Sequence, residues 1–175
     1  MFRVGQGEDI HRIDEARTLV IGGVIIEEGP GLAGHSDADI LLHALTDAVL
    51  GAAALGDIGH YFPPSDPRYA HADSADFLRK ALALAREAGW ELVNLDSTVR
   101  TEKPKLAPYI PHIRDRIAEI TGLPLDAVSV KAKTAEKLDA VGRGEAMFAT
   151  AIVLLERKDQ TSKRNALPEG PRTKD

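Results

Sequence analysis

Cysteine is absent from all 175 residues of the chain. The protein therefore cannot contain a disulfide framework, a thiolate metal site or a cysteine nucleophile. Long apolar runs are lacking as well. No stretch is long enough to cross a bilayer, and the N-terminal sequence MFRVGQGEDIH has no apolar segment typical of a signal peptide. These absences lead us to expect a cytoplasmic protein.

Several common catalytic motifs are also missing. The sequence has no G-x-x-x-x-G-K-[ST] phosphate loop, no G-x-G-x-x-G element, no H-E-x-x-H helix and no G-x-S-x-G turn. P-loop, dinucleotide-binding, zincin and common serine-hydrolase functions are therefore excluded.

Positive charge is scarce outside the C-terminal end. The net charge is −5, but the segment from Arg157 to Asp175 has six basic and three acidic residues, net +3, which leaves −8 for the rest. Nucleic-acid binding needs a basic face, so the composition argues against it. A phosphorylated ligand would need bound metal to offset part of the repulsion.

Hydrophobic periodicity predicts an α/β fold in which helices pack on one face of a mixed sheet, an α+β sandwich. The expected elements are a strand over 3–11, a hairpin over 19–26, helices from Ser36 to about Leu55, after Ser74 to Gly89 and over 110–120, and strands over 93–99, 128–133 and 146–155. The last strand is almost wholly apolar, so we expect it to be buried on both faces, within the subunit or between subunits. Residues 1–157 are predicted to form one domain, and 158–175 a flexible polar tail.

Asp9, His11 and His43 are the main candidates for a metal site. Asp9 and His11 are two residues apart, so an extended strand points both side chains to the same face. One carboxylate and two imidazoles form a common catalytic zinc set with an open position. Asp39 or Asp47, one turn either side of His43, could orient that ring. By spacing alone, the alternative is a chance D-x-H pair with an ordinary helix histidine.

Three further segments carry chemical groups suited to phosphate. His35 and Ser36 precede a predicted helix, where free N–H groups favour anions, although a simple N-cap explains them equally well. Residues 134–137 and 142–145 flank the last two strands and offer a hydroxyl, carboxylates, an amine and a guanidinium. Such loop residues are usually only solvated, and Pro104–Lys105 is an ordinary turn by composition.

Taken together, the motifs resemble a known family. The segments GEDIH, GHSDADILLHALTDAVLGAAALGDIG, FPPSDP, KPKLAPYIPHIR, KAKTAEKL and GRGEA are similar, in order, to the 2-C-methyl-D-erythritol 2,4-cyclodiphosphate synthases over about residues 1–156. The HSDAD-x-x-x-H segment is highly specific. The resemblance implies a homotrimer with an active site at each subunit interface. It also implies conversion of 4-diphosphocytidyl-2-C-methyl-D-erythritol 2-phosphate to the 2,4-cyclodiphosphate with release of CMP, in the non-mevalonate (MEP) pathway to isoprenoids.

The resemblance also implies roles for individual residues. Asp9, His11 and His43 match the zinc ligands, Glu136 matches a ligand of a second cation, Mg²⁺ or Mn²⁺, and His35 and Thr134 match the groups that stabilise the transition state. Residues 57–59 match a ribose loop, 62–66 a methylerythritol loop and 101–107 a cytosine pocket. The implied substrate contacts are Ser36, Asp57, Ile58, Gly59, Phe62, Pro63, Pro64, Ser65, Asp66, Thr101, Lys103, Pro104, Lys105, Leu106, Ala107, Lys133, Ala135, Ala140 and Arg143.

The chain departs from the family pattern at four positions. Pro64 replaces a common acidic residue, Asp139–Ala140 stand where Gly–Phe is common, and Glu8 stands where an aromatic residue can line the trimer's central cavity. In the family that cavity can take an isoprenoid diphosphate, and Arg143 and Glu145 are retained. Two other functions fit the same residues: a metal-dependent phosphohydrolase, which would release inorganic phosphate, and a non-catalytic module that binds metal or nucleotide.

Overall fold

The structure, a computed structural model, describes residues 1–158, so all of the predicted tail except Lys158 lies outside the described residues. The strands are β1 (Phe2–Asp14), β2 (Leu19–Ile21), β3 (Val24–Ile26), β4 (Gly31–Leu32), β5 (Trp90–Arg100), β6 (Val128–Lys133) and β7 (Ala146–Arg157). The helices are α1 (Ile40–Ala53), α2 (Ile58–Tyr61), α3 (Ser74–Glu87), α4 (Ile110–Thr121) and α5 (Asp139–Gly142), with short 3-10 turns at Pro67–Tyr69 and Leu125–Ala127.

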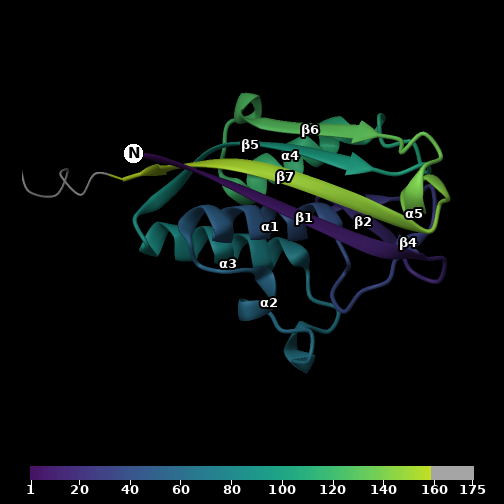
Figure 1. Cartoon of the computed structure of the whole chain (residues 1–175), viewed down its shortest axis with the longest axis horizontal. Helices are drawn as coiled ribbons and strands as arrows, with labels where there is room; N and C mark the ends of the chain where they lie inside the picture. The colour runs from purple at the N-terminus through teal and green to yellow at the C-terminus, as the bar shows by residue number, and fades with distance from the viewer. Residues whose placement is uncertain (159–175) are drawn as a thin grey trace, which may run out of the picture.

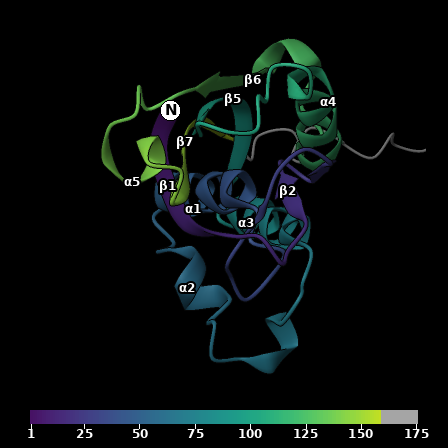
Figure 2. The ribbon, with the colours of Figure 1, turned by 90° about the vertical axis from the view of Figure 1, so that its right-hand side faces the viewer.

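A five-stranded mixed sheet forms the centre of the molecule, in the order β4-β1-β7-β5-β6 (Figure 1). Only β5 and β6 run parallel, and β2 and β3 form a separate hairpin. Helices α1, α3 and α4 cover one face of this sheet (Figure 2). The predicted mixed sheet with packed helices is thus confirmed. Among residues 1–158, no helix is long and apolar enough to cross a membrane.

The last strand, β7, is buried on one face only. Met147, Ala149 and Ala151 point toward the helices and are fully buried, whereas Ile152 on the opposite face is 51% exposed. Burial of both faces within the subunit is therefore excluded for this strand, and burial between subunits stays a prediction. The reason is the layer arrangement: all three long helices pack on the same side, so the apolar side chains on the other side have no cover in the subunit.

The first helix begins at Ile40, not at Ser36 as predicted. Asp39 is the N-cap, and the left-handed φ of +60° at Ala38 ends the loop before it. Asp39 is fully buried and accepts four backbone N–H groups, two from the first turn of α1 and two from the β2–β3 turn at Gly22 and Gly23. Because the Asp39 carboxylate accepts the free N–H groups of the first helical turn, Asp39 is the N-cap and the helix begins at the next residue. Burial raises the pKa of Asp39 to about 6, against the lowering effect of these N–H groups.

Replacing Asp39 with alanine is expected to lower the free energy of unfolding by about 3 kcal/mol, because a cap is lost and buried N–H groups lose their acceptor. Chemical denaturation would measure the change. Asp73 is the matched control: this exposed N-cap of α3 accepts one bond, from Ala75, so Asp73→Ala should cost only about 1 kcal/mol. Equal losses in the two variants would contradict the role given to Asp39.

Candidate active site

The candidate site is built where strand β1 and helix α1 lie in direct contact. Gly5 and Gly7 face α1, and a Cβ atom added to them would lie only 1.9 Å from the Ala48 carbonyl oxygen and 2.0 Å from that of Ala44. The helix backbone can approach the strand only because these two side chains are absent. Strand alternation then places Asp9 and His11 on this same face, next to the first turns of α1.

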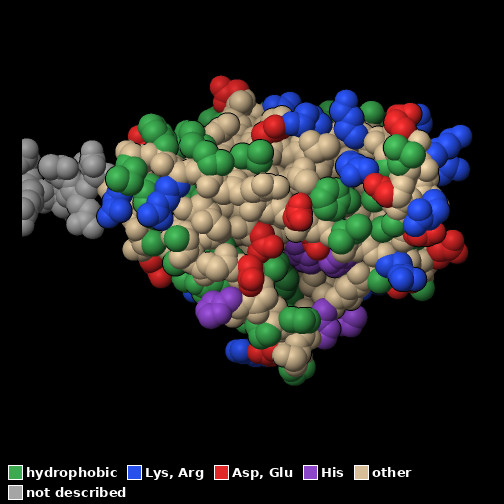
Figure 3. Space-filling model, viewed as in Figure 1, with side chains coloured by type: hydrophobic (Ala, Val, Ile, Leu, Met, Phe, Trp, Pro, Cys, Tyr) green, Lys and Arg blue, Asp and Glu red, His purple; other side chains and the backbone are tan. Residues whose placement is uncertain are grey.

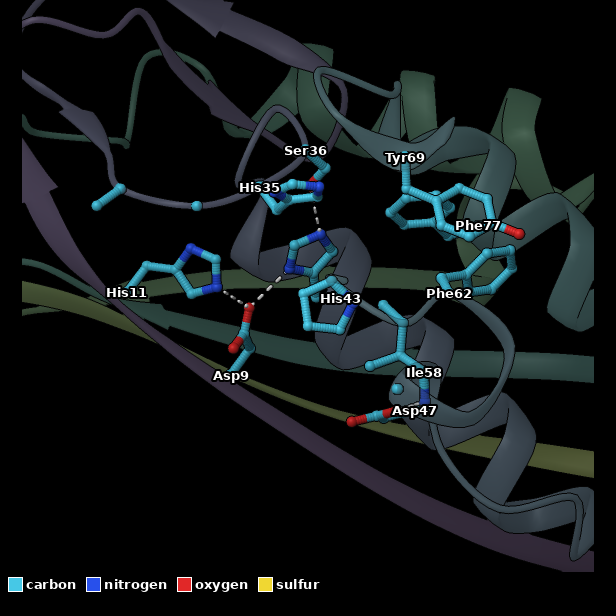
Figure 4. A pocket seen from close by; sticks show the side chains of 14 residues that line it. Asp9, His11, His35, Ser36, His43, Asp47, Ile58, Phe62, Tyr69 and Phe77 are labelled. Carbon is cyan, nitrogen blue, oxygen red and sulfur yellow. Dashed lines mark hydrogen bonds and ion pairs between the residues drawn. The ribbon is translucent and has the colours of Figure 1, made fainter. Parts of the chain in front are cut away.

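Asp9, His11 and His43 converge at this contact, as predicted. Oδ2 of Asp9 lies 2.8 Å from Nδ1 of His43 and 3.1 Å from Nε2 of His11. One donor atom from each of the three residues lies within 4.8 Å of the others. Figure 4 shows both rings pointing at the carboxylate. A nitrogen–nitrogen–oxygen set of this size fits a divalent ion such as zinc.

The electrostatics of the three residues favour positive charge between them. Burial opposes ionisation of Asp9, but the hydrogen bonds from His11 and His43 outweigh it and lower the pKa of Asp9 to about 2. Burial lowers the pKa of His43, yet the hydrogen bond and charge of Asp9 raise it overall. Asp9 is therefore a carboxylate at any ordinary pH, and the ring beside it attracts a proton or a metal ion.

The other nitrogen of His43 is held by two serines, Ser36 at 3.2 Å and, more closely, Ser74. Nε2 of His43 lies 2.9 Å from Oγ of Ser74, and the Ser74 hydroxyl donates to the carboxylate of Asp37. Because its proton goes to Asp37, the Ser74 oxygen can accept an N–H from Nε2 of His43. Nδ1 donates to Asp9, and a bound metal would replace that proton. We predicted that Asp39 or Asp47 orients His43. That prediction is wrong, since Asp39 caps the helix and Asp47 accepts the N–H of Ile58 at 2.7 Å.

Replacing Ser74 with alanine should weaken zinc binding about 10- to 100-fold. A hydrogen bond to the ring nitrogen that does not bind the metal fixes the orientation of the ring. Competition with a chelator would measure the affinity. The control is Ser129→Ala, since this strand residue is exposed and far along the chain from the site. An unchanged zinc affinity in Ser74→Ala would show that His43 is oriented without the serine.

A cavity of about 430 Å³ opens beside the three residues. Figure 3 shows histidine side chains gathered around a hollow on this face, with acidic side chains next to it. Its lining includes the predicted residues His35, Ser36, Ile58, Gly59, Phe62 and Pro64 as well as the metal candidates. It also includes Ala33, Gly34, Tyr69 and Phe77, which the sequence did not single out as site residues, and Asp47, which the sequence suggested only as a support for His43.

Aromatic side chains form one wall of the cavity. The rings of Phe62 and Phe77 stack with centroids 4.4 Å apart, and Tyr69 meets both edge-on. Phe77 falls within the helix predicted after Ser74. The aromatic run Tyr61–Phe62 and Tyr69 in an irregular loop was the available signal, because apolar rings outside a periodic element need a partner to cover them. This wall excludes water from one side of the cavity.

The loop with His35 is held from a distance by Arg17. Its guanidinium donates to the carbonyl oxygens of Gly34 and Ser36, on either side of His35. The sequence contained no pattern that pointed to this contact, which spans the chain from the β1–β2 turn. Arg17 therefore fixes the backbone that presents the histidine to the cavity.

The remaining predicted residues do not line this cavity. Asp57 caps α2 and lines a neighbouring acidic hollow, while Pro63, Ser65 and Asp66 belong to the loop beyond. Within residues 1–158, none of the predicted residues at 101–107 and 133–143 contributes to the cavity lining. They follow the ends of the parallel strands β5 and β6 instead. One chain thus carries two separate groups of predicted site residues.

Comparison with known proteins matches these features to a family. The family model of the YgbB family matches residues 2–156. The chain belongs to the YgbB family. Its relatives include the 2-C-methyl-D-erythritol 2,4-cyclodiphosphate synthase of Moorella thermoacetica, 56% identical over 154 residues that cover 88% of this chain and 94% of the relative. The enzyme of the same name from Thermosynechococcus vestitus is 53% identical over 155 residues, which cover 89% of this chain and 96% of the relative.

Solved structures of the YgbB family relatives share the fold. A 2C-methyl-D-erythritol-2,4-cyclodiphosphate synthase in a CDP-bound form superposes with a TM-score of 0.82 at 40% identity, covering 88% of this chain and all of the other. The bifunctional IspDF from Campylobacter jejuni gives a TM-score of 0.87 at 41% identity; the match covers 91% of this chain and 43% of that longer chain. The resemblance noted in the sequence is therefore confirmed.

Proposed function

We propose that this protein converts 4-diphosphocytidyl-2-C-methyl-D-erythritol 2-phosphate to 2-C-methyl-D-erythritol 2,4-cyclodiphosphate and releases CMP, as a step of isoprenoid precursor synthesis. The observation that carries the proposal is the convergence of Asp9, His11 and His43 on one cavity. It occurs in a chain 56% identical to a relative named for this activity.

Asp9, His11 and His43 would hold zinc, and Glu136 a second divalent cation, Mg²⁺ or Mn²⁺. Cations bound there would neutralise and polarise the phosphate oxygens of the substrate. Asp9 is ionised and both rings turn a nitrogen toward it, so one donor atom from each of the three residues lies close to the other two. The identity of the metals is part of the proposal.

The chemistry needs no nucleophile from the protein. An oxygen of the 2-phosphate attacks the β-phosphorus, the bond from that phosphorus to the bridging oxygen breaks, and CMP leaves with the electron pair. Both reacting groups belong to one substrate, so the protein has to fold the substrate and stabilise charge. His35 and the hydroxyl of Thr134 would donate hydrogen bonds to the developing charge. In the free chain that hydroxyl donates to Glu136 at 2.6 Å.

A homotrimer would bring the two groups of site residues together. The outer face of the sheet exposes several large apolar side chains, and a second copy of the chain could cover them. The most exposed of these are Phe2, Val4, Ile10 and Ile152. Since the cavity contains Asp9 but neither Thr134 nor Glu136, each site would take one group from one subunit and the second group from its neighbour.

Mixed assemblies test the shared site. His11→Ala and Glu136→Ala chains should each be inactive alone, but co-assembled trimers should recover up to about one third of wild-type CMP release, because one of the three interfaces combines two intact groups. Differently tagged chains, co-expressed and purified through both tags, would supply the mixture. A mixed assembly with no recovered activity would contradict an interface site.

The cytoplasmic location and the domain boundary after residue 157 stay predictions from the sequence.

A further inference from the structure

The loop after β6 is held in a backbone shape that ordinary residues rarely adopt. Glu136, Lys137 and Asp139 have φ angles of +52°, +64° and +54°, all in the left-handed region. Side chains with a Cβ disfavour this region, so other contacts must hold the loop. The same loop carries Thr134 and Glu136, the two residues that the proposed function places at the reacting phosphates.

One side chain from another loop makes such a contact. Oε1 of Glu102 accepts the backbone N–H groups of Ala135 at 2.9 Å and of Lys137 at 3.2 Å. Two N–H groups converging on one point form a concave anion site in the backbone, and the half-buried Glu102 carboxylate fills it. The two bonds span the segment that contains Glu136.

Glu102 lies on the loop after β5, which includes the predicted cytosine pocket. The strands β5 and β6 are parallel neighbours in which Arg100 pairs with Lys133, so their loops leave the sheet side by side. The Thr101 N–H also donates to the Lys133 carbonyl oxygen at 3.0 Å, at the base of both loops. Beyond this point the Glu102 side chain ties the loop after β5 to residues 135–137, and the Arg100–Asp139 ion pair joins the end of β5 to the segment further along.

We propose that Glu102 is a positioning residue that holds Thr134 and Glu136 in register with the nucleotide-binding loop. This inference rests on the proposed function for the roles of those loops. Glu102 itself does not touch the reacting groups. It acts by filling the backbone concavity at 135–137 and so keeping the strained loop in one shape.

Two substitutions at Glu102 test the role, with trypsin cleavage after the exposed Lys137 and steady-state kinetics as readouts. Glu102→Ala should speed cleavage about tenfold and lower kcat about 10- to 100-fold, with little change in KM, because the reacting geometry is loosened. The cleavage rate and kcat of Glu102→Gln should stay within about threefold of wild type. The N–H groups of Ala135 and Lys137 bond to one oxygen of Glu102, and the glutamine amide retains that oxygen. Zinc content should be unchanged in both variants.

Glu119→Ala is the matched control, because this glutamate is on the surface of α4 and pairs with Arg116. The proposal would be overturned if Glu102→Ala matched wild type in cleavage rate and kcat. It would also be overturned if kcat fell and cleavage sped up as much in Glu102→Gln as in Glu102→Ala. If the wild-type chain released no CMP, the proposed function would fail. The trypsin comparison would then still decide whether Glu102 holds the loop.

Discussion

Replacing His43 with alanine should remove zinc and CMP release together. The ring contributes Nδ1 to the donor set, 2.8 Å from Asp9, and no other described side chain of the cavity could take its place between Asp9 and Ser74. With one of three protein ligands gone, we expect less than about a tenth of the wild-type zinc content and at least about a 10³-fold loss of kcat. Metal analysis and a CMP assay on the same preparation measure both effects.

The matched control for His43→Ala is His112→Ala, because His112 is exposed on α4, away from the cavity. It should leave zinc content and activity unchanged. Full zinc content with normal CMP release in the His43 variant would show that the metal site is wrongly assigned. Loss of activity with full zinc content would show that the ring acts otherwise than as a ligand.

Replacing Gly7 with alanine should disturb the whole site from outside it. The added Cβ would lie 2.0 Å from the Ala44 carbonyl oxygen, so α1 must move away from β1 and carry His43 away from Asp9. We expect the free energy of unfolding to fall by about 3 kcal/mol. Zinc affinity should fall at least about tenfold, since the ligands come from the two elements that separate. Denaturant titration and chelator competition would measure the two losses.

Gly51 supplies the comparison, because it lies on the same helix but its Cβ position is 3.9 Å from the nearest atom. Gly51→Ala should raise the free energy of unfolding by about 0.5–1 kcal/mol, because alanine has a better helix propensity than glycine. A Gly7→Ala protein with wild-type stability and zinc affinity would mean that the close contact of strand and helix is not what positions the ligands.

The strand and helix pattern was predictable because each element has a strong period and clear ends. The third predicted helix, for example, ends at Gly122, whose φ of +76° suits a glycine. The start of α1 was not predictable from the same rules. Ser36 and Asp39 fit a capping box, but Asp39 is drawn into the interior by the N–H groups of the β2–β3 turn, a contact between segments far apart in sequence.

The metal ligands were predictable from alternation and residue type, whereas the contacts that support them were not. Ser74 and Asp37 reach His43 from another helix and from a loop, so no local spacing reveals them. The open face of β7 could not be read from composition either. An apolar strand looks the same whether a helix or a second subunit covers it.

One departure from the family pattern has a structural explanation. Asp139 stands where glycine is common, and its φ of +54° is one that favours glycine. Its side chain compensates by accepting the N–H of Val141 at 2.8 Å and pairing with Arg100 at 2.9 Å. Pro64 still lines the cavity, and Glu8 lies exposed on the outer face of β1.

We propose that the cavity folds one substrate so that its own 2-phosphate attacks the β-phosphorus, whereas a phosphohydrolase would use water as the nucleophile. The most direct test is turnover of the diphosphocytidyl substrate in ¹⁸O-labelled water with zinc and magnesium supplied. We predict one CMP per substrate, a cyclic diphosphate that contains no ¹⁸O, and no inorganic phosphate. ¹⁸O in a phosphate of the product, or release of inorganic phosphate, would show that water and not the 2-phosphate is the nucleophile.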